Sequence, residues 1–153
     1  MLALLVRPIA SHDRVGWLPL WDGYNAFYGR CGRAALDERV TAQTWQRFFD
    51  ASSNVRALVA EVDGRVVGLA HCVIHTSTSR LADVCYLQDL FTEPSVRGKG
   101  VGRALIDGVK QLARDARCCR VYWHTQTSNT AGRALYDKVA QHKGFIVYSA
   151  ELD

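Results

Sequence analysis

Apolar residues recur with a period of about 2 residues in some segments and about 3.6 in others, which predicts alternating strands and helices. Strands are expected at residues 2–9, 55–62, 65–74, 84–92, 118–125 and 145–150. Helices are expected at residues 11–28, 41–50, 101–116 and 128–142, with Ser11 and Ser128 as N-caps of the first and the last. This order predicts a mixed α/β sheet with helices packed on it.

Local signals support several of these elements. Asp63-Gly64 predicts a tight hairpin, because a type I′ turn needs positive φ at both central residues. The helix at 101–116 has one apolar face that is expected to pack on the sheet, formed by Val101, Leu105, Val109 and Leu112. The first helix has a weaker stripe, formed by Val15, Leu18, Trp21 and Ala26.

Composition narrows the class of protein. The chain has 153 residues and 48% hydrophobic content, which fits one globular domain over residues 1–153. The longest apolar run, Leu2 to Val6, is too short to cross a bilayer, so no membrane partner is expected. The five cysteines are odd in number and lack both CxxC and zinc-ligand spacing. Reduced thiols in a cytoplasmic protein without a bound metal are therefore expected.

Net charge is +4, and part of it lies in the stretch EPSVRGKGVGRALIDGVKQ, residues 93–111. Its glycines do not form a dinucleotide fingerprint, which would need glycine at 103, and no Walker sequence follows. The remaining pattern is Arg97-x-x-Gly100-x-Gly102 ahead of a helix. Glycines let backbone N–H groups surround an anion, and a helix N-terminus adds unpaired donors. The pattern predicts a pyrophosphate site, with a flexible loop of solvated charges as the alternative.

No long basic run or row of aromatic residues accompanies these charges, so no nucleic-acid partner is expected. The stretch YLQDLFTEPSVRGKGVGRALI resembles the strand, loop and helix of the GNAT superfamily of acyl-CoA N-acyltransferases. SNTAGRALYDKVAQHKGF is similar to the Asn–x6–Tyr helix of the same family and the strand that follows it. YLxDLF and LYDKVA resemble its small branch that acetylates polyamines, thialysine-like amino acids or histone lysines.

The resemblance implies an α/β GNAT fold with a mixed, mostly antiparallel sheet. Two parallel strands would splay apart to bind acetyl-CoA. The cofactor-binding residues that it implies are Leu90, Phe91, Thr92, Arg97, Gly98, Lys99, Gly100, Val101, Gly102, Arg103, Asn129, Arg133 and Tyr136. Asn129, Arg133 and Tyr136 share one helix face by spacing. Tyr136 is implied as the proton donor to the leaving thiolate, with a packing tyrosine as the alternative.

Gln88 and Asp89 stand where related polyamine enzymes often have Glu-Asp. Glutamine cannot act as a base, so Asp89 is expected either to take the proton of the amine or to hold a cationic substrate. Gln88 and Asp89 would face opposite ways on a regular strand, and a bulge of the kind found in the family would change this.

Aromatic residues near the expected end of the first helix are candidates for the acceptor pocket. Trp21, Tyr24 and Tyr28 are expected to line it, because aromatic rings favour cations, with ordinary helix core as the alternative. His71 is expected to be a surface or hydrogen-bonded histidine, whereas His124 is a candidate base, proton relay or substrate contact.

The resemblance implies an N-acetyltransferase that moves acetyl from acetyl-CoA to a small primary amine, cationic amines included, by direct attack in a ternary complex. Cys85 is only a weak candidate for a covalent intermediate. A protein lysine or N-terminal acetyltransferase and a non-catalytic acyl-CoA-binding regulatory module stay open as alternatives. A homodimer is expected, with the strand at 145–150 as an edge or swapped contact.

Overall fold

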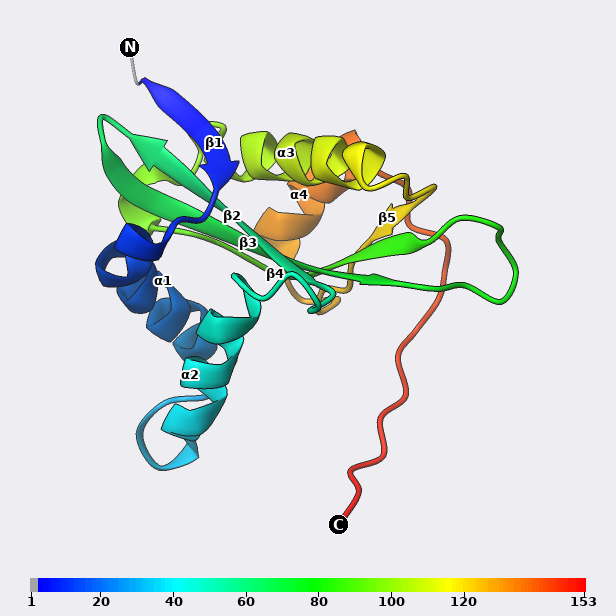
Figure 1. Ribbon diagram of the computed structural model, residues 1–153, viewed down its shortest axis with the longest axis horizontal. Helices are drawn as coiled ribbons and strands as arrows, with labels where there is room; N and C mark the ends of the chain where they lie inside the picture. The colour runs from blue at the N-terminus through cyan, green and yellow to red at the C-terminus, as the bar shows by residue number, and fades with distance from the viewer. Residues whose placement is uncertain (1–2) are drawn as a thin grey trace. The chain divides into compact units, whose positions relative to one another are not determined.

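Five of the expected strands form one sheet in a computed structural model, which describes residues 3–153 (Figure 1). In sheet order they are β1 (Leu4–Pro8), β2 (Val55–Val62), β3 (Arg65–His75), β4 (Val84–Thr92) and β5 (Val121–Tyr122). Neighbours are antiparallel except β4 and β5, which are parallel. The mixed, mostly antiparallel sheet is therefore confirmed, while the start of the first expected strand at Leu2 lies outside the described residues.

The helices begin at different residues from those expected. They are α1 (Arg14–Phe27), α2 (Glu38–Arg47), α3 (Val101–Asp115) and α4 (Thr130–Val139). Ser11 does not cap α1, because a 3₁₀ turn, η1 (Ser11–Asp13), precedes it. The helix expected from residue 41 begins at Glu38, since the Asp37 side chain accepts a hydrogen bond from Arg39 N at 2.9 Å.

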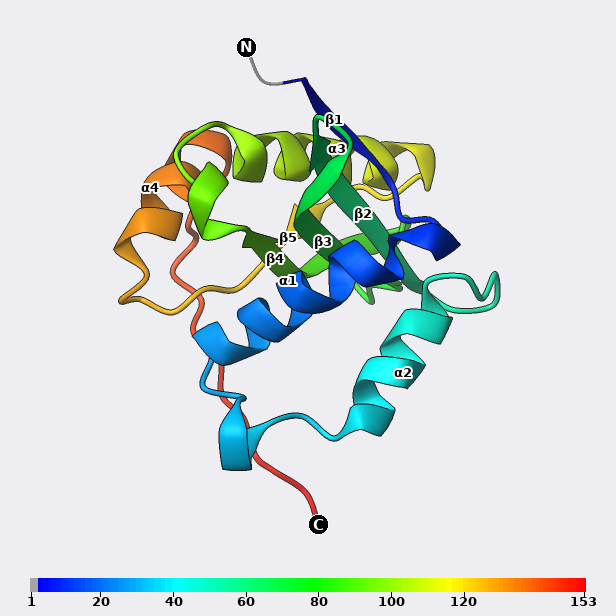
Figure 2. The ribbon, with the colours of Figure 1, turned by 90° about the vertical axis from the view of Figure 1, so that its left-hand side faces the viewer.

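Helices cover both faces of the sheet, with α3 on one face and α1 and α2 on the other (Figures 1 and 2). The buried face of α3 includes Val101, Leu105 and Val109, as the apolar spacing predicts. The stripe expected for α1 is wrong at Val15, which is 87% exposed, and at Ala26, which is also exposed, but it is confirmed at Trp21. The other residues that α1 buries against the sheet are Trp17, Leu20 and Tyr24. The large aromatic rings bury more apolar area than Val15 would, which favours this orientation.

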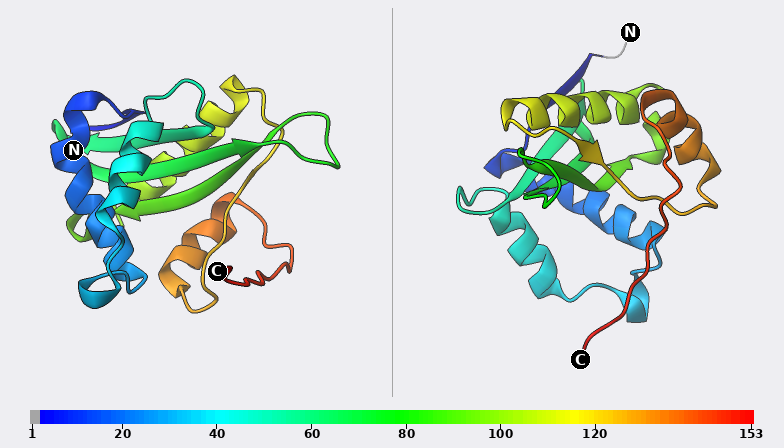
Figure 3. Two further views of the ribbon diagram at one scale, coloured as in Figure 1. Left: turned by 60° about the horizontal axis from the view of Figure 1, so that its bottom comes forward. Right: turned by 90° about the vertical axis from the view of Figure 1, so that its right-hand side faces the viewer.

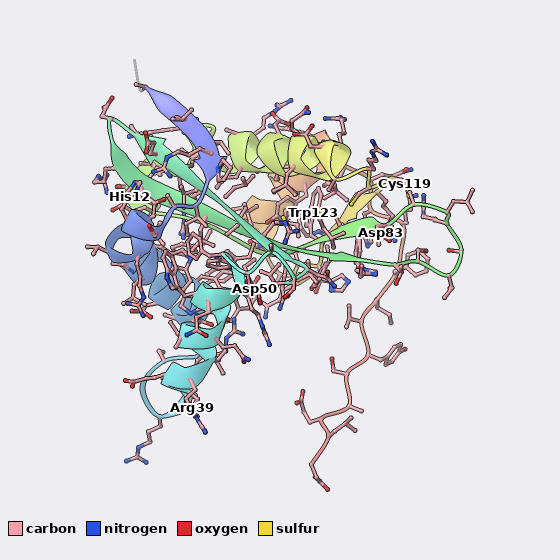
Figure 4. The ribbon with its side chains drawn as sticks, in the orientation of Figure 1. His12, Arg39, Asp50, Asp83, Cys119 and Trp123 are labelled. Carbon is pink, nitrogen blue, oxygen red and sulfur yellow. The ribbon has the colours of Figure 1, made fainter. Side chains whose placement is uncertain are left out.

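The hairpin and the parallel strand pair follow the sequence-based expectation. Asp63 and Gly64 both have positive φ, 50° and 80°. At the start of the parallel pair, Cys119 N–H donates to Asp83 O at 3.0 Å (Figure 4). The ladder between β4 and β5 ends at Tyr86 and Tyr122, well before β4 ends at Thr92. The second strand of the pair is much shorter than the expected 118–125.

Residues His124–Asp153 form a compact unit separate from the one that ends at Trp123. In this unit α4 is capped by Asn129 rather than Ser128, because the Asn129 side chain accepts a hydrogen bond from Gly132 N at 3.2 Å. The expected strand at 145–150 is wrong for the described chain, in which these residues are exposed and pair with no strand. A strand needs a neighbour for its N–H and C=O groups. Whether 1–153 folds as a single domain stays a prediction.

Among the helices described between residues 3 and 153, none is long and apolar enough to cross a membrane.

Candidate functional site

A cavity of about 510 Å³ opens in the unit that contains the sheet. Its lining comes from α1, α2, the segment between them, and the strands β2, β3 and β4. Figure 3 shows α1 and α2 on the same side of the sheet. Gln88 and Asp89 both line this cavity, as do Trp21 and Tyr24. Four of the residues expected to act on or bind the acceptor thus meet in one place.

A β-bulge brings Gln88 and Asp89 to the same cavity. In the β3–β4 ladder His71 pairs with Asp89 and Cys72 pairs with Leu87, so Gln88 has no partner in the register. Asp89 is buried and Gln88 is exposed. Since an extra residue breaks the alternation of side chains, both can contribute to one surface.

Asp89 is held by a chain of buried hydrogen bonds. The Trp17 indole N–H donates to His71 Nε2 at 3.0 Å, and His71 Nδ1 lies 2.9 Å from Asp89 Oδ2. An indole nitrogen can only donate, so Nε2 accepts and the ring proton lies on Nδ1. His71 is therefore a neutral donor to the carboxylate. The expectation of a hydrogen-bonded histidine is confirmed, but the sequence pattern does not reveal its contact with Asp89.

Tyr24 lies beside the bulge that carries Gln88 and Asp89. Tyr24 Oη donates to the backbone oxygen of Gln88 at 3.3 Å. Burial raises the pKa of Tyr24, and the negative charge of Asp89 raises it further, so this hydroxyl stays protonated. Tyr28 is not a lining residue of the cavity; its ring instead packs edge-on against Tyr24, with centroids 5.1 Å apart.

Two arginines that the sequence analysis does not single out also line the cavity. Arg30 follows α1, and Arg47 is the last residue of α2. Arg30 Nε donates to Asn25 Oδ1 at 2.7 Å. Neither arginine belongs to a motif, and the separate segments that carry them come together only in the fold, so spacing along the chain gives no signal for them.

The glycine-rich loop has the backbone that an anion site requires. Gly98 and Gly100 have φ of 77° and 86°, and a Cβ atom built on either would meet no heavy atom within 4 Å. The first helical hydrogen bond of α3 runs from Ala104 N to Gly100 O at 3.0 Å. The N–H groups of Val101, Gly102 and Arg103 thus precede the first closed turn. Open space beside these donors fits a phosphate group.

Of the three basic side chains expected to bind phosphate, Arg97 forms contacts with β4, whereas Lys99 and Arg103 are exposed. The Arg97 side chain turns back onto β4, where Nε donates to Thr92 O at 3.2 Å and the guanidinium carbon lies 5.2 Å from the Phe91 ring centroid. Arg97 therefore holds the loop to the end of β4, whereas Lys99 and Arg103 face solvent. Leu90, Phe91 and Thr92 are all partly buried on β4.

In the unit from His124 onward, Asn129 has a structural role at the start of α4. Its side chain caps the helix at Gly132 N and donates to Thr125 Oγ1 at 2.9 Å. A Cβ on Gly132 would collide with the Asn129 side chain, so the cap requires a glycine at this position. Arg133 donates to Thr127 O at 3.0 Å. Tyr136 lies on α4 and His124 begins the unit.

Two further features are Cys85, the weak candidate nucleophile, and possible metal ligands. Cys85 is 0% exposed, so it cannot reach a substrate in this conformation. Among residues 3–153 no group of three or more His, Cys, Asp or Glu side chains could hold a metal ion.

The mixed sheet, its parallel strand pair and the glycine loop agree with the fold that the resemblance implies. The model of the Acetyltransferase (GNAT) family matches residues 17–140. The chain belongs to this family and is an N-acetyltransferase.

Relatives with assigned names agree with this class. The D-amino-acid N-acetyltransferase HPA3 of Saccharomyces cerevisiae is 31% identical over 147 residues, which cover 95% of this chain and 89% of the yeast protein. The aminoglycoside N(6')-acetyltransferase type 1 of Klebsiella aerogenes is 25% identical, covering 86% of this chain and 85% of that protein. The structure of AAC(6')-Iy with the bisubstrate analogue CoA-S-monomethyl-acetylneamine shares the fold, with a TM-score of 0.80 at 17% identity over 98% of this chain and 99% of that chain.

Proposed function

We propose that the protein transfers the acetyl group of acetyl-CoA to the primary amine of a small molecule, by direct attack while both are bound. The observation that carries this proposal is the Asp89 carboxylate, held by His71 at 2.9 Å, in a cavity of about 510 Å³. Cavities of roughly 300–1,000 Å³ are typical of small-molecule sites. The size of the cavity favours a small acceptor over a folded protein substrate.

Acetyl-CoA supplies the activated acetyl group, and the loop before α3 is suited to its pyrophosphate. Gly98 and Gly100 leave open space beside the free N–H groups of α3. Lys99 and Arg103 would neutralise the phosphate charge, and β4 from Leu90 to Thr92 would contact the pantetheine arm. The family resemblance adds Asn129, Arg133 and Tyr136 to this set.

Asp89 is the proposed base that accepts a proton from the amine of the acceptor. The amine binds as an ammonium ion and transfers a proton to the carboxylate, directly or through water. The neutral nitrogen then forms the new C–N bond at the thioester carbonyl and loses its second proton to water, the C–S bond breaks, and the departing thiolate takes a proton. Tyr136 is the proposed donor of that proton, with His124 as the next candidate. Gln88, which cannot act as a base, is proposed as a polar contact to the acceptor.

The test is turnover of acetyl-CoA with a panel of amines, followed by the release of free thiol. Polyamines, amino acids, an aminoglycoside and a lysine peptide are assayed at equal concentration. Thiol release that depends on a small amine, with the acetylated product identified by mass spectrometry, is the expected result. Turnover with the lysine peptide alone would refute the small acceptor, and no turnover with any amine would refute the proposed function.

A further inference from the structure

We propose that Arg30 and Arg47 form a carboxylate-binding subsite in the acceptor cavity, and that the preferred acceptor is an amino acid with an apolar side chain. This inference rests on the proposed function, because it identifies the substrate class of the same cavity. It favours an amino acid over a polyamine among the acceptors of the branch that the sequence resembles.

The Arg30 side chain is held in place through its Nε atom, which leaves its other guanidinium N–H groups available to a ligand. Its Nε donates to Asn25 Oδ1 at 2.7 Å, and its guanidinium carbon lies 5.7 Å from the ring centroid of Tyr24 and 5.4 Å from that of Tyr28. No carboxylate of residues 3–153 pairs with Arg30. A guanidinium that is positioned through Nε and two rings can offer its remaining N–H groups to a carboxylate of a ligand.

Arg47 reaches the cavity from the opposite helix. It follows Val40 and Thr44 on α2 at the i, i+4 and i+7 spacing of one helix face, and all three line the cavity. Arg47 also has no carboxylate partner within the described part of the chain. The cavity is therefore lined by two cationic side chains, neither of which forms an ion pair with an acidic residue in the described part of the chain.

The balance of charge in the cavity selects against a dication. Asp89 is the one carboxylate among the described lining residues, and His71 is neutral because its Nε2 accepts from Trp17. A polyamine in this cavity would be attracted by the Asp89 carboxylate but repelled by Arg30 and Arg47, and such repulsion between like charges disfavours binding. An amino acid satisfies both signs, with its ammonium group at Asp89 and its carboxylate at the arginines.

The rest of the lining indicates the side chain of the acceptor. Leu36 and Val40 line the cavity from the helical side, and Val55 and Val73, which are paired across β2 and β3, line it from the sheet. These aliphatic side chains offer an apolar surface for the acceptor to cover. Leucine is therefore a suitable probe, since it joins an amine, a carboxylate and an aliphatic side chain.

The experiment compares leucine with leucinamide, 3-methylbutylamine and spermidine as acceptors. Both enantiomers of leucine are assayed, and the one with the higher kcat/KM is used in the comparison. The amine of leucinamide loses its proton more readily than that of leucine, so this comparison is biased against the proposal. We expect leucine to exceed each of the others in kcat/KM by about 10-fold or more, the scale of one charge-assisted hydrogen-bonded pair. Binding of N-acetylleucine and its amide, measured by calorimetry without acetyl-CoA, gives a second readout.

Arg47→Gln and Arg30→Gln are expected to remove most of the preference for leucine over 3-methylbutylamine. Arg114→Gln, an exposed change on α3 with the same loss of charge, is the control and should keep it. Melting temperatures identify any variant that fails to fold, and Arg47, which is exposed, is the safer site. Equal or better turnover of 3-methylbutylamine or spermidine overturns the inference and leaves the proposed function intact. Absence of turnover with every amine overturns both.

Discussion

Replacement of Asp89 by asparagine separates the chemical role of this residue from its structural one. Asp89 is 9% exposed and takes the hydrogen bond of His71 Nδ1 at 2.9 Å. The amide oxygen of asparagine can accept the same bond, and the variant no longer buries a charge. We therefore expect the free energy of unfolding to change by about 1 kcal/mol or less. Proton transfer to a positioned base contributes roughly 10²- to 10⁴-fold to rate, so kcat should fall by at least about 10²-fold.

The assay measures kcat and KM for the acceptor identified by the amine panel, together with calorimetric binding of acetyl-CoA. Affinity for acetyl-CoA should stay close to wild type, because Asp89 lines the acceptor cavity. Asp107→Asn, an exposed change on α3, controls for the loss of one negative charge. A loss confined to KM would show that Asp89 only holds the ammonium group. An unchanged kcat/KM would refute the assignment of the cavity as the acceptor site.

Other predictions test the remaining parts of the molecule. Gly100→Val should weaken acetyl-CoA binding by about 10-fold or more, because φ of 86° strains a β-branched residue; near-normal affinity by calorimetry in a folded variant would exclude the loop as the pyrophosphate site. Tyr136→Phe should bind acetyl-CoA normally but lose on the order of 10²-fold in kcat, and wild-type turnover would make it a packing residue. Hydrogen bonds from Arg7 lower the pKa of Asp13, so this stabilisation is complete above the unfolded pKa of about 3.9 and is lost as pH falls through the folded value. Asp13→Asn should thus destabilise the fold by roughly 2–3 kcal/mol at pH 7, and a difference that persists in acid would contradict the linkage. The exposed apolar segment at 145–150 is predicted to pair with a second copy of the chain, so sedimentation at micromolar concentration should detect a dimer, and a monomer would refute the pairing.

The sequence predicts the sheet well because period-2 alternation and turn residues are local signals. β2 and β4 have the expected bounds, and Asp63-Gly64 forms the expected turn. The orientation of α1 is predicted poorly, since aromatic residues such as Trp17 are ambiguous between core and pocket until the sheet is present. The segment at 145–150 has the composition of a strand, but a strand also depends on a neighbour that composition does not reveal.

In the candidate site too, features formed by contiguous residues are predictable from the sequence, whereas those that depend on the fold are not. The glycine loop is contiguous in sequence, so its residue types and order predict a backbone suited to an anion. Arg30 follows α1 and Arg47 ends α2, so these arginines reach the same cavity only through the fold. No motif connects them, which is why spacing along the chain predicts the glycine loop but not the charge of the cavity.

The bulge at Gln88 determines which side chain of β4 faces His71. Alternation along β4 is compatible with either side chain of the Gln88-Asp89 pair facing the helices, so the pattern alone leaves the choice open. The ladder passes from the pair of Asp89 and His71 directly to that of Leu87 and Cys72, and this keeps the carboxylate opposite the imidazole. Trp17 then determines which ring nitrogen carries the proton. The state of the proposed base thus depends on a bulge and on a buried indole, and the indole belongs to Trp17, which lies far from the stretch that resembles the family.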